Sequence, residues 1–229
     1  MIHTSKLIVR VQTIEKKIED LDDITRDIVS CQMRKQCDEG GPRIFAQFPL
    51  LNEIVSAGVY DEARSSGAIY FRVGEEEVSE SEEEGIRFKP VRTEKDILEN
   101  FWNVASHYTE FVSFGGRTVE GPALMLRSAL YGIRASKDLM SARQLHDQRF
   151  DALHVDLLDQ FNFYGASEQP AGLHMWCKAF GIESPYETSE HDVDRAFEEG
   201  RYQDIARRNA RDLHAIHQLY ASWSASLRF

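Results

Sequence analysis

Glu120 is the residue whose position most clearly suggests chemistry, because it stands between an expected strand and an expected helix. The strand is Glu110 to Phe114, where polar and apolar residues alternate. A turn over residues 115–118 follows it, and the helix then begins with Pro122 in its first turn. We expect the apolar stripe of this helix to consist of Leu124, Leu126, Ala129 and Leu130. Ligands and catalytic groups gather at such junctions in open α/β sheets, so Glu120 is a candidate functional carboxylate.

A second candidate carboxylate, Asp212, lies in a long helix expected over residues 202–227. Arg208 stands four residues before it, and residues four apart share one face of a helix. The two side chains can therefore form a bidentate ion pair. The same pair is also typical of an exposed helix surface, where it contributes only a few tenths of a kcal/mol.

The segment around Glu120 resembles a motif of a known family. Residues 114–122 read Phe-Gly-Gly-Arg-Thr-Val-Glu-Gly-Pro. This is similar to the second motif of the predicted 3′–5′ exonucleases related to the proofreading domain of family B DNA polymerases, whose usual form is Phe-Asn-Gly-Arg-x-Phe-Asp-x-Pro. The resemblance extends from roughly Leu7 to Trp223 and includes residues 154–159 and 184–185. Glu120 takes the place of the family's aspartate and is one methylene longer.

The resemblance implies a site in which four carboxylates hold two Mg²⁺ or Mn²⁺ ions. Two such ions can activate a water molecule and stabilise the leaving oxygen, and hard cations favour oxygen ligands. In the family's third motif, Tyr-x-x-x-Asp, Asp212 takes the place of the aspartate and Arg208 that of the tyrosine. A guanidinium at that place would take over part of the charge role of a metal, so we expect metal binding to be weak or absent and Arg208 to bind Asp212 or Glu120.

The family's first motif, Asp-x-Glu at the end of the first strand, has two possible registers here. Thr13-Ile14-Glu15 keeps the glutamate and loses the aspartate, whereas Arg10-Val11-Gln12 loses both acids. We favour the first register because it keeps a carboxylate. The resemblance then implies a site of Glu15, Glu120 and Asp212, altered at Thr13 and Arg208. Without the resemblance, Glu15 beside two lysines is typical of a solvated strand end.

The elements that must position these residues follow from hydrophobic periodicity and capping. Further strands are expected over residues 7–15, 51–60, 67–73, 86–90 and 152–157, and further helices over residues 22–33, 94–106, 173–180 and 193–199. Thr93 and Asp96 are expected to cap the helix at 94–106, and Gly181 and Gly200 are expected to end the helices at 173–180 and 193–199. This order predicts an α/β fold of RNase H-like architecture, a mixed sheet flanked by helices. We expect one domain over residues 1–229.

Composition limits the class of protein. The chain has 229 residues and a formal charge of −11, which argues against coating duplex DNA by phosphate neutralisation. Seven glutamates lie between Gly74 and Gly85, and we expect this self-repelling run to be a solvated loop. Cys31, Cys37 and Cys177 lack paired spacing and are expected to be reduced thiols. No apolar run reaches the length of a membrane span, so we expect a soluble, cytoplasmic protein.

The middle of the chain combines cations with aromatic residues. Six basic residues lie between Arg117 and Arg149, and Phe161, Phe163 and Tyr164 follow. Such residues suit a groove for single-stranded nucleic acid, because bases stack on aromatics and phosphates need cations. They are equally typical of a core and a mixed surface. The histidines have no metal-ligand spacing, and we expect one of them, at position 154, to be packed beside a strand.

Two functions follow from these observations. In the first, the protein is an exonuclease-like nucleic-acid-binding protein with a degraded two-metal site, a pseudoenzyme whose activity is weak or lost. In the second, it is a working metal-dependent 3′–5′ exonuclease on single-stranded DNA or RNA that uses Glu15, Glu120 and Asp212. A protein partner is compatible with either function, and no membrane contact is expected.

Overall fold

The computed structural model describes residues 6–15, 22–23, 51–75, 77–167, 171–185 and 193–228. The helix expected over residues 22–33 lies outside this part of the chain, apart from Asp22 and Asp23, and so do Cys31 and Cys37. Within the described part, no helix is both long and apolar enough to cross a bilayer.

The centre of the fold is one mixed sheet with the strand order β4-β5-β3-β2-β1-β6-β7. β2 runs antiparallel to its neighbours β1 and β3, while β6 and β7 run parallel to β1. The strands are β1 (Lys6–Glu15), β2 (Asn52–Asp61), β3 (Ser66–Arg72), β4 (Ser81–Glu83), β5 (Ile86–Val91), β6 (Glu110–Ser113) and β7 (Leu153–Asp156). An antiparallel meander extended by parallel strands beside β1 is the RNase H-like arrangement, so the predicted fold is confirmed.

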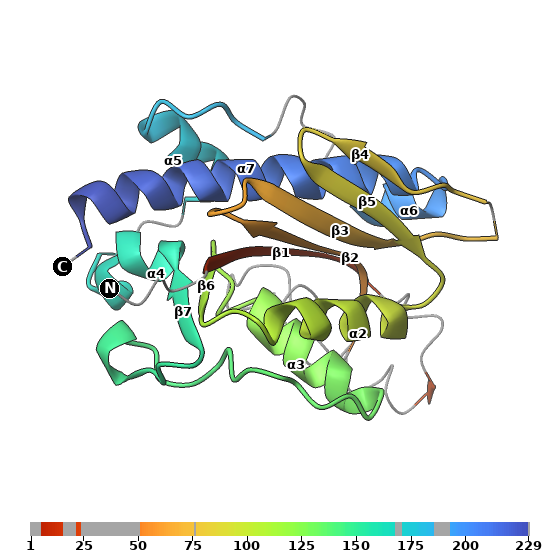
Figure 1. Ribbon diagram of the computed structural model, residues 1–229, viewed down its shortest axis with the longest axis horizontal. Helices are drawn as coiled ribbons and strands as arrows, with labels where there is room; N and C mark the ends of the chain where they lie inside the picture. Colours follow the sequence, from red (N-terminus) through yellow and green to blue (C-terminus); the bar gives the residue numbers. More distant parts are fainter. Residues whose placement is uncertain are drawn as a thin grey trace.

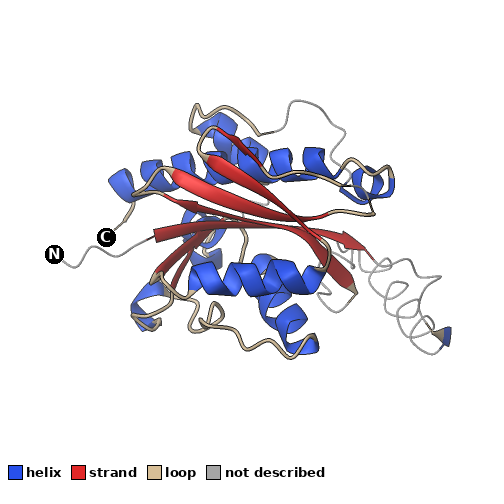
Figure 2. Cartoon of the chain, turned by 45° about the vertical axis from the view of Figure 1, so that its right-hand side comes forward, coloured by secondary structure: helices blue, strands red, loops and turns tan. Residues whose placement is uncertain are grey.

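Helices cover both faces of the sheet (Figure 2). The longer helices are α2 (Glu94–Ala105), α3 (Glu120–Leu130), α5 (Leu173–Ala179), α6 (Val193–Glu198) and α7 (Tyr202–Ser226). α2 and α3 lie on one face, and α7 crosses the other (Figure 1). Successive residues of β1 feed the two cores, since Leu7 packs with Phe101 of α2 and Ile8 packs with Leu213 of α7. β1 is therefore buried between both helical layers, which explains its β-branched sequence.

Local signals located most elements correctly. Thr93 and Asp96 form the expected capping box at the start of α2. α5 and α6 are followed by Gly181 and Gly200, whose φ angles of 68° and 73° suit a glycine that ends a helix. These signals act over a few residues and need no tertiary information.

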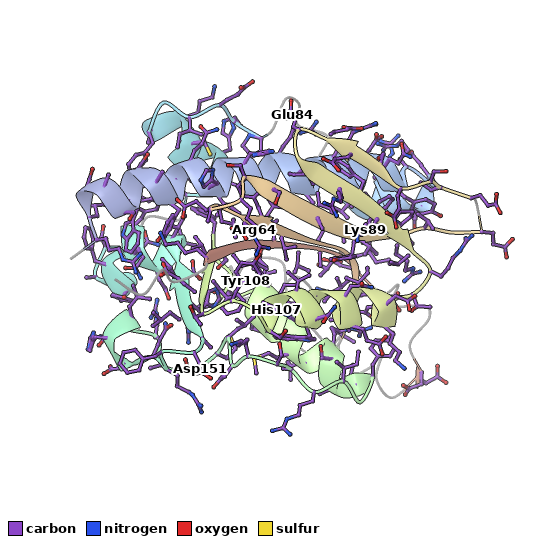
Figure 3. The ribbon with its side chains drawn as sticks, in the orientation of Figure 1. Arg64, Glu84, Lys89, His107, Tyr108 and Asp151 are labelled. Atoms are coloured by element: carbon purple, nitrogen blue, oxygen red, sulfur yellow. The ribbon has the colours of Figure 1, made fainter. Side chains whose placement is uncertain are left out.

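The acidic run is not entirely a loop. Ser81–Glu83 forms β4 and pairs antiparallel with β5, so the strand expected over residues 86–90 is second from the sheet edge. Glu84 and Gly85, with φ angles of 50° and 78°, form the turn, and Glu84 is labelled in Figure 3. A short, charged edge strand discourages pairing with other chains, so the glutamates of β4 protect the edge of the sheet.

The inward face of α3 differs from the expected apolar stripe. Leu124 is buried, but Leu126 and Leu130 are exposed, as is Ala129. Arg127 is buried instead, and its Nε donates to the Glu94 carboxylate of α2 over 2.8 Å. A charged residue can face inward here because its partner is buried with it.

Candidate functional site

Arg10 of β1 joins two buried carboxylates that come from opposite faces of the sheet. Its Nη1 donates to Glu120 Oε1 of α3 over 2.7 Å, and its Nε donates to Asp212 Oδ2 of α7 over 2.9 Å. The side chain of Arg10 is 17% exposed, whereas those of Glu120 and Asp212 are 2% and 0% exposed. One guanidinium therefore connects the sheet to both helical layers, and we call these residues, with Gln12, the Arg10 cluster.

Gln12 extends the same cluster. It lies two residues after Arg10 on the same face of β1, and its Nε2 donates to Asp212 Oδ2 over 3.0 Å. Asp212 is close enough because α7 approaches the sheet at Gly58, the residue paired with Arg10 across β1 and β2. A Cβ atom at Gly58 would lie 2.5 Å from Asn209 Oδ1, so this approach requires a glycine.

A turn held by hydrogen bonds places Glu120 at the start of α3. The carboxylate of Asp156, at the end of β7, accepts hydrogen bonds from the backbone N–H groups of Gly115 and Arg117 over 2.7 and 2.9 Å. Gly115 adopts a φ of 72°, which favours glycine. This loop connects the carboxyl end of β6 to α3, so the strand-to-helix junction predicted for Glu120 is confirmed.

The Arg10 cluster contains two buried carboxylates but only one guanidinium. Glu120 Oε2 and Asp212 Oδ1 are enclosed and have no hydrogen-bond partner among the described residues. Burial raises the pKa of the Glu120 carboxyl, and the Arg10 guanidinium opposes that rise. Burial, and to a lesser extent the Asp212 carboxylate, raises the pKa of the nearby Cys177 thiol to about 11. Solvent therefore screens these charges poorly.

Comparison with known families identifies the class of this fold. A family model described as a predicted 3′–5′ exonuclease related to the exonuclease domain of PolB matches residues 69–225. The chain belongs to this exonuclease family. No curated protein matches the chain. The match includes Glu120 and Asp212 but begins within β3, so Arg10 and Gln12 precede it. Membership in the exonuclease family implies a nucleic-acid substrate.

The expectation that Glu15 would converge with Glu120 and Asp212 was wrong. Glu15 is the exposed last residue of β1, and its backbone N–H donates to Asp194 of α6 over 2.6 Å. Glu15 lies five positions after Arg10, about 16 Å along an extended strand. Thr13 lies one residue beyond Gln12 and therefore faces the other side of the sheet.

The β1 residues that bind Glu120 and Asp212 are Arg10 and Gln12, the two ends of the other register, Arg10-Val11-Gln12. β1 pairs parallel with β6 so that Ile8 lies opposite Val112, which brings Arg10 level with the end of β6. Both registers lie in the same strand, so no local feature of the sequence distinguished Arg10-Val11-Gln12 from Thr13-Ile14-Glu15.

The expected partner of the carboxylates was also wrong. The guanidinium bound to Asp212 and Glu120 is that of Arg10, not that of Arg208, which lies one turn before Asp212 in α7 and is half-buried. Arg208 was chosen because it is near Asp212 in sequence. Arg10 lies 202 residues from Asp212, and only the packing of α7 on β1 brings the two together.

The exonuclease family generally uses divalent metals, and the residues of the Arg10 cluster do not fit two such ions. The cluster contains two carboxylates beside Arg10 and Gln12, and both carboxylates accept hydrogen bonds from Arg10. Among the described residues, no group of three or more histidine, cysteine, aspartate or glutamate side chains is arranged to hold a metal ion. Hard divalent cations depend on a larger set of anionic oxygens.

His154 is a packed residue, as predicted. It is buried in β7, and its Nδ1 donates to the backbone oxygen of Leu139 over 2.9 Å. The carbonyl oxygen can only accept, so Nε2 is the acceptor for the Ser113 hydroxyl, 2.7 Å away. Burial lowers the pKa of His154, which keeps the ring neutral.

Proposed function

We propose that the protein binds the 3′ ends of single-stranded nucleic acid and does not hydrolyse them by a two-metal reaction. The observation that carries this proposal is the pair of hydrogen bonds from Arg10 to Glu120 and Asp212. The proposal retains the family's class of substrate and changes what happens at the site.

Charge supports the loss of hydrolysis. Four carboxylates would carry four negative charges, whereas Arg10, Gln12, Glu120 and Asp212 together carry about one when both acids are ionised. A divalent ion would have to displace the guanidinium, which binds both acids at 2.7 and 2.9 Å in a place with little water. The guanidinium supplies a fixed positive charge between the acids, but it cannot activate a water molecule as a metal ion does.

Restoring the first motif tests the proposal. We would measure Mn²⁺-dependent shortening of 5′-labelled single-stranded DNA and RNA by the wild-type protein and by the double variant Arg10→Asp, Gln12→Glu. The wild type should leave both strands intact, and the double variant should shorten them from the 3′ end. Thr13→Asp is the matched control, because it completes the other register of the motif on the wrong face of β1 and should remain inactive.

A thermal measurement separates metal binding from catalysis. A ligand that binds the folded state raises its stability, so Mn²⁺ should raise the melting temperature of the double variant and leave those of the wild type and Thr13→Asp unchanged. Mn²⁺-dependent hydrolysis by the wild type, together with a wild-type thermal shift, would refute the proposal. So would an inability of the wild type to bind any single strand.

A further inference from the structure

Three large apolar side chains are exposed near short helices that pack on α7, the helix that carries Asp212. Phe163 and Met175 are each 59% exposed, and Phe180 is 38% exposed. They come from the short 3-10 helix η4 (Phe163–Gly165) and from α5 and its C-terminal end. Phe180 packs against Phe161 and Trp176, whose rings lie 4.5 Å apart and nearly parallel; Phe161 is buried and Trp176 is partly buried. We call the three exposed side chains the aromatic patch.

The segments that carry the patch adjoin residues of the functional site. α4 (Leu157–Phe161) leads into η4 and starts at Asp156, whose carboxylate holds the loop before Glu120. On the other side, Cys177 of α5 is near enough to Asp212 for that carboxylate to contribute to its raised pKa. Both α4 and α5 pack on α7 (Figure 1). A single-stranded nucleic acid whose 3′ end lies at the Arg10 cluster would therefore run close to α4 and α5.

The turn that exposes Phe163 has an unusual backbone. Phe163 and Tyr164 have φ angles of 49° and 57°, a region that bulky residues rarely adopt. The turn is held by the Tyr164 hydroxyl, which accepts hydrogen bonds from the backbone N–H of Leu145 and from Gln160 Nε2. Such strain persists at functional sites, where the surrounding structure enforces it. Here it fixes a large aromatic ring in solvent, where burial cannot stabilise the ring.

We propose that the aromatic patch stacks the bases of single-stranded nucleic acid bound at the Arg10 cluster. Phe163 and Phe180 offer ring faces on which any base can stack, and Met175 offers a polarisable apolar contact. Lys178, exposed on α5 between Met175 and Phe180, can neutralise a phosphate. This inference rests on the proposed function and adds to it the part of the surface that holds the bases.

Binding to a strand with and without bases tests the inference. We would measure the anisotropy of a labelled DNA strand, and of an abasic strand of equal length, in EDTA with the wild type, Phe163→Ala and Phe163→Gly. Both variants should bind the normal strand roughly 5- to 100-fold more weakly than the wild type. All three proteins should bind the abasic strand equally weakly. Phe163→Gly also relieves the positive φ, so an unchanged or higher melting temperature would show that the fold is intact.

Phe150→Ala is the matched control. Phe150 is 92% exposed, but it precedes β7, at the other end of that strand from α4, so its loss should not change binding. Its neighbour Asp151 is labelled in Figure 3. The inference is overturned if Phe163→Ala binds the normal strand like the wild type, or if it loses affinity for both strands equally. If the wild type binds neither strand, the proposed function fails as well.

Discussion

Replacing Arg10 with methionine should strongly destabilise the fold, because it leaves Glu120 and Asp212 buried without their cation. Removing one partner of a buried ion pair costs about 3–5 kcal/mol. Solvent screening reduces this little, since Arg10 is 17% exposed and the acids are almost fully buried. We therefore expect the free energy of unfolding at pH 7.5 to fall by about 3–5 kcal/mol, a large share of a typical domain's stability.

The loss should depend on pH in a defined direction. Without Arg10, the folded-state pKa of the buried Glu120 carboxyl rises further above its value in the unfolded chain, so the folded state binds a proton that the unfolded state does not. Stability of the variant then falls as pH rises, by up to about 1.4 kcal/mol per pH unit. The difference in stability from the wild type should shrink by up to about 2.7 kcal/mol between pH 7.5 and pH 5.5.

Urea denaturation at the two pH values measures both effects. The control is Arg149→Met, since Arg149 is 71% exposed and pairs with the exposed Asp151 at 3.2 Å, an arrangement worth about 0–1 kcal/mol. The reasoning would be refuted if Arg10→Met lost less than about 1 kcal/mol at pH 7.5, or if its loss were the same at pH 5.5.

Three further predictions concern the support of the site. Arg127→Met leaves the Glu94 carboxylate buried without its cation and should cost about 3–5 kcal/mol in urea denaturation; a loss below about 1 kcal/mol would contradict the structure. Gly58→Ala places a Cβ atom 2.5 Å from Asn209 Oδ1 and should cost about 1–3 kcal/mol, and an unchanged melting temperature would show that α7 can move away from the sheet. Burial lowers the pKa of His154, so the stability that the neutral ring provides above its ordinary pKa of about 6.5 is lost as pH falls below that value. The free energy of unfolding of His154→Gln should therefore fall less between pH 7 and pH 5 than that of the wild type. Equal falls in the two proteins would exclude His154 as a cause.

The local features of the protein follow from the amino-acid sequence alone. Thr93 and Asp96 predicted the start of α2, and Gly181 and Gly200 predicted the ends of two helices. The alternation and turn before Glu120 placed this acid at the start of a helix. These features depend on interactions between residues a few positions apart, which are present in the linear pattern.

The resemblance to the exonuclease family supplied what local patterns could not, namely that Glu120 and Asp212 belong to one site. Both residues lie in the segment covered by the family model, residues 69–225. β1 lies before this segment, and its register had to be chosen on residue type alone. That choice favoured Glu15 because it is an acid, although the β1 residue that binds the two carboxylates is Arg10.

Which residues meet at the site depends on how distant parts of the chain pack together. The pairing of β1 with β6 brings Arg10, rather than Glu15, to the end of β6, and a shift of three residues also reverses the face of the sheet. Glu94 likewise decides that Arg127 faces inward and Leu126 outward in α3. Both choices are settled by partners far away in the sequence, and a buried charge is stable only where its counter-charge is brought to it by the fold.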